Sequence, residues 1–223
     1  MVKQLVLEGL NMGSEMLDRS LRYAQTMMVS ADIPIRKFKH IHPELATTML
    51  IDAQTQTIRV LEDFCLLYAT VMEKTWLQYL CDGYLLFIPV CFPADDHWIV
   101  VVLWMNDANQ FLVRVYNSFK DYRIHDKILA LAAAQVVETM SQHNVQWHFS
   151  PCEDLLDQKN NAHRCGVHSV ARAVQCMVKQ MHMKLNITAV SRVGDFLASA
   201  ALVHDKILVE DIDVSPQLIT LMV

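Results

Sequence analysis

The first part of the chain has apolar residues at helical spacing. After Gly13, four apolar residues recur at steps of three or four positions and predict a helix, with Ser14 available as its cap; they are Leu17, Leu21, Ala24 and Met28. A short helix is predicted from about residue 43 to residue 50, because Pro43 suits a first helical turn. From residue 57 to about residue 80, a further apolar stripe predicts one long helix or two.

The middle of the chain changes to a pattern typical of β-strands. β-Branched and aromatic residues dominate three runs, at residues 84–91, 97–104 and 110–116. Turn-forming residues separate these runs, and the second and third are expected to form a hairpin.

The last third returns mainly to helical spacing. Helices are predicted at residues 124–143, 166–183 and 188–203, with a short strand at 145–149. Helices, then a small sheet, then helices again predict an α+β fold rather than an alternating α/β fold. No repeat or linker divides the sequence, so we expect one catalytic domain over residues 1–223.

Composition narrows the class of protein. The 223 residues carry a net charge of −5 and no run of Lys or Arg, which argues against nucleic acid as a partner. The apolar stretches fall short of the roughly 18 residues that a membrane span needs, and the N-terminus lacks the pattern of a secretory signal. The six cysteines are irregularly spaced, which favours a reducing compartment. We therefore expect a soluble, cytoplasmic monomer.

Cys165 is the cysteine best placed for chemistry. It follows a polar loop and precedes an apolar helical run, so it should open that helix. The positive end of the helix dipole and the unpaired N–H groups there favour a thiolate. Gly166 would let a substrate backbone come close. A small core residue at a helix start is the alternative interpretation of Cys165.

A nucleophilic cysteine needs a base, and the base needs a partner that orients it. His97 begins a predicted strand directly after a turn, and Asn117 closes the next strand, where it could fix the imidazole tautomer. Gln158 stands in the loop before Cys165 and could share an oxyanion site with the Cys165 N–H group. Taken singly, the first two would be turn residues and Gln158 a loop residue.

This ordered set resembles clan CE cysteine peptidases, which include the adenovirus protease, the SUMO-specific proteases and bacterial effector deubiquitinases. The family has His-Trp on one strand, Asp or Asn after the next, and Gln six or seven residues before Cys-Gly. This chain has His97-Trp98, Asn117, Gln158 and Cys165-Gly166 in that order, and the resemblance extends over about residues 13–203.

The resemblance implies a papain-like fold of the SUMO-protease type, a small central mixed sheet with the catalytic Cys opening a central helix. It implies cleavage after the C-terminal Gly-Gly of ubiquitin or a ubiquitin-like protein, without cofactor or metal. Trp98 would line the channel for the Gly-Gly tail, and Asp18 would meet a basic residue of that tail. A helical insertion at 53–80 would contact the modifier, and the tail at 204–223 would pack or bind a partner. As in bacterial effectors, the protein could also be secreted and act in a host cytosol.

Several alternatives stay open. Asp is commoner than Asn at the third triad position, so Asp121 could serve instead of Asn117. Some proteins of this clan are acetyltransferases that would use Cys165 as the acyl carrier, and a non-catalytic scaffold would only bind the modifier. A zinc site is a weaker alternative, because its four candidate ligands match no usual spacing; they are Cys152, His163, Cys165 and His168.

Overall fold

A computed structural model describes residues 12–52, 55, 57–58, 74–92, 97–118, 126–150, 165–178, 190 and 192–193. The chain divides into two compact units. A sheet unit comprises Lys37–Leu155, and a helical unit comprises Met1–Arg36 with Leu156–Val223. Each unit is described by itself.

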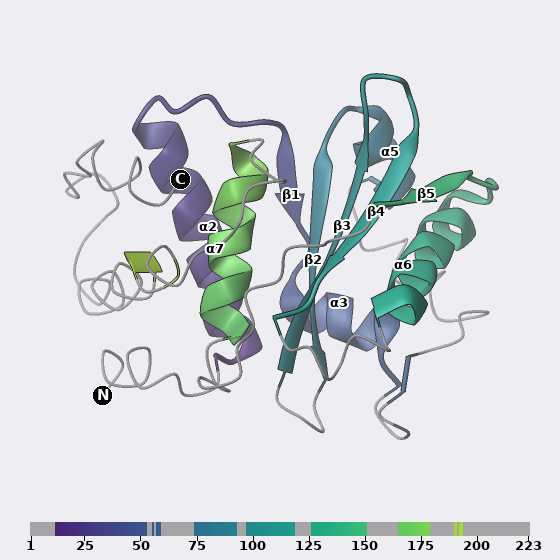
Figure 1. Cartoon of the computed structure of the whole chain (residues 1–223), viewed down its shortest axis with the longest axis horizontal. Helices are drawn as coiled ribbons and strands as arrows, with labels where there is room; N and C mark the ends of the chain where they lie inside the picture. Colours follow the sequence, from purple (N-terminus) through teal and green to yellow (C-terminus); the bar gives the residue numbers. More distant parts are fainter. Residues whose placement is uncertain are drawn as a thin grey trace. The chain divides into compact units, whose positions relative to one another are not determined.

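The sheet unit holds a five-stranded mixed sheet in the order β1-β2-β3-β4-β5 (Figure 1). The strands are β1 (Phe38–His40), β2 (Leu85–Phe92), β3 (His97–Met105), β4 (Phe111–Tyr116) and β5 (Trp147–Phe149). The three central strands are antiparallel neighbours, and both edge strands pair in parallel. Each parallel pair needs a long connection between its strands, and helices are found in both of these connections.

Three helices cover one face of this sheet: α3 (Pro43–Leu50), α5 (Trp76–Cys81) and α6 (Asp126–Ser141) (Figure 1). Alternate residues of the central strands point toward these helices, and β3 contributes Ile99, Val101 and Leu103 to the shared core. Trp76 begins α5 and is fully buried in this core. The helix starts with a capping box, in which Thr75 and Gln78 bond each other's backbone N–H groups.

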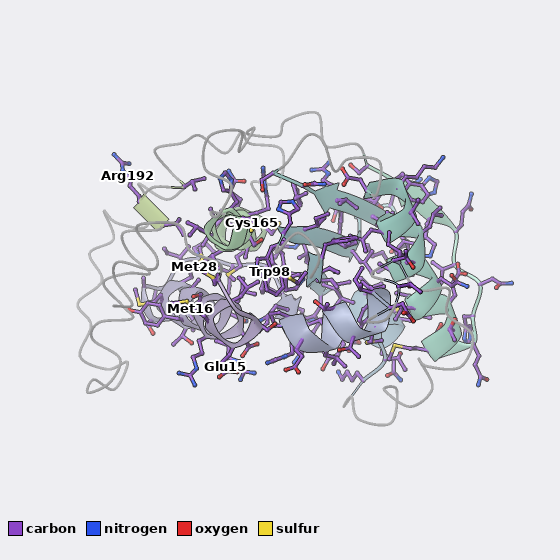
Figure 2. All side chains as sticks on the ribbon, turned by 90° about the horizontal axis from the view of Figure 1, so that it is seen from below. Glu15, Met16, Met28, Trp98, Cys165 and Arg192 are labelled. Carbon is purple, nitrogen blue, oxygen red and sulfur yellow. The ribbon has the colours of Figure 1, made fainter. Side chains whose placement is uncertain are left out.

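The helical unit contains α2 (Ser14–Ser30) and α7 (Cys165–Met177), which lie side by side (Figure 1). Met28 lies on the side of α2 that faces α7, whereas Glu15 lies on the opposite side (Figure 2). The Arg36 N–H group donates to the Met177 carbonyl over 2.9 Å, which ties the chain after α2 to the end of α7. Over the described part of the chain, no helix combines the length and apolar character that a membrane span requires.

Most predicted elements are confirmed within a few residues. The predicted β-runs are β2, β3 and β4, the predicted hairpin joins β3 to β4, and the helix predicted at 43–50 is α3. The strand at 145–149 is β5, and the helix at 124–143 is described as α6. The predicted helix at 166–183 begins one residue earlier as α7 and gives way to a turn at Val178; residues 179–183 lie outside the described part. Of the helix predicted at 188–203, only Val190, Arg192 and Val193 are described, and they are helical.

Two local predictions are wrong, and one strand was not predicted. Ser14 is the first helical residue of α2, and its N-cap is Gly13, which has no side chain to donate or accept. The helix predicted from residue 57 does not begin there, because Ile58 forms a β-bridge with Ile51. Strand β1 was not expected, since three residues are too few to show an alternating pattern. Most of the predicted insertion at 53–80, and the whole tail at 204–223, lie outside the described residues.

Candidate active site

The topology of the sheet brings His97 and Asn117 together. β3 starts at His97, and β4 ends one residue before Asn117, so antiparallel pairing places both residues at the same end of the two strands. Strand alternation puts both side chains in the rows that face α6. His97 Nε2 lies 2.9 Å from Asn117 Oδ1, and both residues are buried. The structure therefore joins two of the predicted residues by a hydrogen bond within one rigid hairpin.

A third side chain, Asp126, contacts the same asparagine from the first turn of α6. Asn117 Nδ2 donates to Asp126 Oδ1 over 2.8 Å. The result is a row of three side chains, His97–Asn117–Asp126, which we call the relay. Sequence reasoning missed Asp126; the available signal was a carboxylate nine residues after Asn117 at the start of a predicted helix.

Cys165 belongs to the helical unit, where it is the first residue of α7, as predicted. Figure 2 shows it on this helix. It is a buried thiol with 1% of its surface exposed. The Ser169 hydroxyl donates to the Cys165 carbonyl oxygen over 2.9 Å, one turn along the helix. The N-terminus of an α-helix is a position that favours a thiolate over a thiol.

Gly166 is closely covered by Met12. A Cβ atom added to Gly166 would lie 2.6 Å from the Met12 Cβ and 3.0 Å from its sulfur. Glycine is therefore required at this position by packing within the helical unit itself. Packing alone thus explains why residue 166 is a glycine, and the access of a substrate backbone to Gly166 stays a prediction.

Trp98 and Asp18 occupy buried positions. Trp98 follows His97 on β3, so its side chain points to the face of the sheet opposite α6, where it is 4% exposed. The Asp18 side chain is 6% exposed, and its Oδ2 accepts from Arg22 Nε over 2.7 Å. A basic residue of a substrate would thus meet a carboxylate that already has a partner.

Two predicted site residues, Gln158 and the alternative triad residue Asp121, lie outside the described residues. The same is true of two of the four candidate zinc ligands, Cys152 and His163. Within the described ranges, no three His, Cys, Asp or Glu side chains gather in a group that could hold a metal ion. The residues on which the structure bears are therefore the relay, Cys165, Gly166, Trp98 and Asp18.

Comparison with known proteins gives only weak likenesses. The chain matches no protein-family model and no curated protein sequence. Among solved structures, a cysteine-to-alanine mutant of Xanthomonas XopD is 18% identical, covering 92% of this chain and 95% of the other, with a TM-score of 0.40. A second Xanthomonas XopD structure, described as giving insight into the substrate specificity of ubiquitin-like protein proteases, is 16% identical. It covers 79% of this chain and 97% of the other at the same TM-score. Likenesses at this level support no conclusion about the fold or activity of this chain.

Proposed function

We propose that the chain is a cysteine peptidase that cleaves after the C-terminal Gly-Gly of ubiquitin or a ubiquitin-like protein, as clan CE enzymes do. The observation that carries the proposal is the bond between His97 Nε2 and Asn117 Oδ1, at the strand ends where the sequence motif requires it. A His held by an Asn is a competent partner for a nucleophilic cysteine. Cys165, which opens α7, supplies that cysteine.

The tautomer of His97 follows from its partner. An amide oxygen can only accept a hydrogen bond, so Nε2 carries the hydrogen and donates it to Asn117. In the neutral ring, the unprotonated nitrogen is then Nδ1. This is the nitrogen that would take the proton from the Cys165 thiol.

The proposed reaction uses this base twice. The Cys165 sulfur attacks the carbonyl carbon of the second glycine, and His97 takes the thiol proton at Nδ1. The Cys165 N–H group and the Gln158 side chain would stabilise the oxyanion that forms. His97 then gives its proton to the leaving amine as the carbon–nitrogen bond breaks. Water, activated by the same His97, hydrolyses the resulting thioester and releases the modifier with a free carboxylate, so no cofactor is needed.

Trp98 and Asp18 are proposed as substrate contacts. A large flat side chain at Trp98 would narrow the channel so that only residues without a Cβ pass, which selects Gly-Gly. Asp18 would add an ionic contact to the modifier's tail, at the expense of sharing its carboxylate with Arg22.

The test is covalent labelling with a ubiquitin probe that carries a C-terminal electrophile, together with a panel of probes built on other modifiers. We expect labelling of one cysteine, which is lost with all turnover in Cys165→Ala while the fold is retained. Cys81 is an exposed thiol, so Cys81→Ala is the matched control and should be labelled like the wild type. Labelling that persists in Cys165→Ala would refute the proposal.

The two alternatives give different results in the same material. An acetyltransferase would take up label from acetyl-CoA at Cys165, which a peptidase would not. A non-catalytic scaffold would bind the modifier and neither react with the probe nor cleave a conjugate.

A further inference from the structure

Asp126 accepts a hydrogen bond from the side-chain amide of Asn117, and the proposed reaction gives it no role. The Asn117 amide has an oxygen at one end and a nitrogen at the other, and rotation by half a turn exchanges them. In one orientation Oδ1 faces His97, and in the other Nδ2 does. The orientation of the amide therefore decides whether the His97 ring carries its hydrogen on Nε2 or on Nδ1.

The carboxylate of Asp126 selects between these orientations. An ionised carboxylate accepts hydrogen bonds and cannot donate them, so only the amide nitrogen can face it. The 2.8 Å bond from Asn117 Nδ2 to Asp126 Oδ1 therefore directs Oδ1 toward His97, where the 2.9 Å bond is found. If the amide turned over, Oδ1 would meet the carboxylate and Nδ2 would meet the Nε2 hydrogen, and both contacts would be repulsive.

Asp126 also supplies a charge that Asn117 lacks. A neutral asparagine stabilises a protonated imidazole less than a carboxylate would. A hydrogen bond to a charged group is stronger than one between neutral groups, and bonds in a row polarise one another. Asn117 is fully buried, whereas Asp126 is partly exposed, so the charge of Asp126 acts through a buried amide and is partly screened by water.

We infer that Asp126 is a positioning residue for the base: it fixes the Asn117 amide, and thereby the His97 tautomer, and stabilises the imidazolium through the amide. The inference deepens the proposed function and rests on it for its effect on catalysis. The effect on the tautomer does not depend on any activity.

The first experiment reads the tautomer by ¹⁵N NMR of the His97 ring, in protein that carries Cys165→Ala. The ring nitrogens of a neutral histidine have different ¹⁵N shifts according to which one bears the hydrogen. We expect the Nε2–H form in the parent protein and a mixture of the two forms in Asp126→Ala. A pure Nε2–H form in both proteins would overturn the inference, whether or not the chain is a peptidase.

The second experiment separates positioning from helix stability. Asp126 lies in the first turn of α6, where a negative charge also stabilises the helix. Lys127 is the exposed next residue, so Lys127→Glu combined with Asp126→Ala returns a negative charge to that turn without a carboxylate at Asn117. We expect this pair of changes to restore thermal stability but neither the tautomer nor turnover. Restoration of all three would show a purely structural role and overturn the inference.

The third experiment exchanges the two side chains. In active protein, Asp126→Ala should lower kcat/KM by about 10- to 100-fold, the rate equivalent of one charge-assisted hydrogen bond. Asn117→Asp alone would place two carboxylates in contact and should be impaired as well. Asn117→Asp with Asp126→Asn keeps one carboxylate and one amide in hydrogen-bond contact and should recover activity to within about threefold of the wild type. If Asn117→Asp alone equals this exchange, the two groups are not coupled and the inference fails.

Discussion

Gly166 offers a sharp test of why a glycine follows the proposed nucleophile. Packing against Met12 would exclude a Cβ at residue 166 in the folded protein itself. Passage of a substrate would exclude a Cβ only when the substrate binds. The substitution Gly166→Ala distinguishes the two reasons, because they predict opposite changes in the stability of the unliganded protein.

The size of the effect follows from the contact distances. The Met12 sulfur, 3.0 Å from the added Cβ, can move by rotation of its own side chain. The Met12 Cβ, at 2.6 Å, is fixed to the backbone, so either α7 or the chain at residue 12 must shift. Overpacking of this kind costs about 1 to 3 kcal/mol. Alanine in place of glycine in a helix returns about 0.5 to 1 kcal/mol.

We therefore expect Gly166→Ala to lower the free energy of unfolding by about 1 to 2 kcal/mol. For a chain of this length, that corresponds to a fall in Tm of about 2 to 8 °C. Thermal and urea unfolding of the purified variants measure it. Met12→Gly removes the obstructing Cβ, so in that background Gly166→Ala should be neutral or stabilising by up to about 1 kcal/mol.

Two results of the double-mutant cycle formed by Gly166→Ala and Met12→Gly would contradict this expectation. If Gly166→Ala raises the stability of the wild type and abolishes only turnover, the space above Gly166 serves the substrate and Met12 does not require the glycine. If the effect on stability is the same with and without Met12→Gly, the two residues are not coupled and the packing argument is refuted.

Two further predictions concern other parts of the chain. Gln158→Ala should lower kcat by about 10²- to 10³-fold in a modifier-cleavage assay if its amide stabilises the oxyanion, and an unchanged rate would remove it from that role. Burial raises the pKa of the Tyr23 phenol above its ordinary value, so the folded state holds this proton more tightly than the unfolded state. The contribution of protonated Tyr23 to the free energy of unfolding is complete below about pH 10, and it is lost as the pH rises toward the folded-state pKa. Urea unfolding between pH 8 and pH 11 should show a shallower alkaline loss for Tyr23→Phe, and an equal loss would contradict this assignment.

The central strands were predictable because their signals are local. β3 and β4 are long β-branched runs, and the turn between them is built by its own residues: Asn106 Oδ1 accepts from the N–H groups of Ala108 and Gln110. Asn109 takes a positive φ of 57°, which asparagine tolerates better than most residues. A reader of the sequence can find both the strands and the hairpin without knowing the rest of the fold.

The errors occur where distant residues decide the structure. β1 pairs with β2, which begins 47 positions after Phe38, and three residues carry no periodicity of their own. Ile58 fits the apolar stripe of a helix, yet it pairs with Ile51 in a β-bridge. In both cases, pairing with another segment of the chain, a strand for β1 and the single residue Ile51 for Ile58, decides the local structure.

The candidate site divides in the same way. The positions of Cys165, His97 and Asn117 at element ends could be predicted, because element ends are marked in the sequence by turn residues and changes of period. The contact of Asp126 with Asn117 could not, because it depends on how the first turn of α6 lies against the end of β4.

The proposed catalytic groups belong to different units, and this makes their roles separable. The relay His97–Asn117–Asp126 lies wholly within the sheet unit, so the contacts that select the tautomer of neutral His97 are made there. Cys165 and Gly166 belong to the helical unit, where the dipole of α7 acts on the proposed nucleophile Cys165 and Met12 packs against Gly166. A substitution in the relay should therefore change the His97 tautomer whether or not Cys165 is present. A substitution at Met12 or Gly166 should change turnover or stability and leave the tautomer as it was.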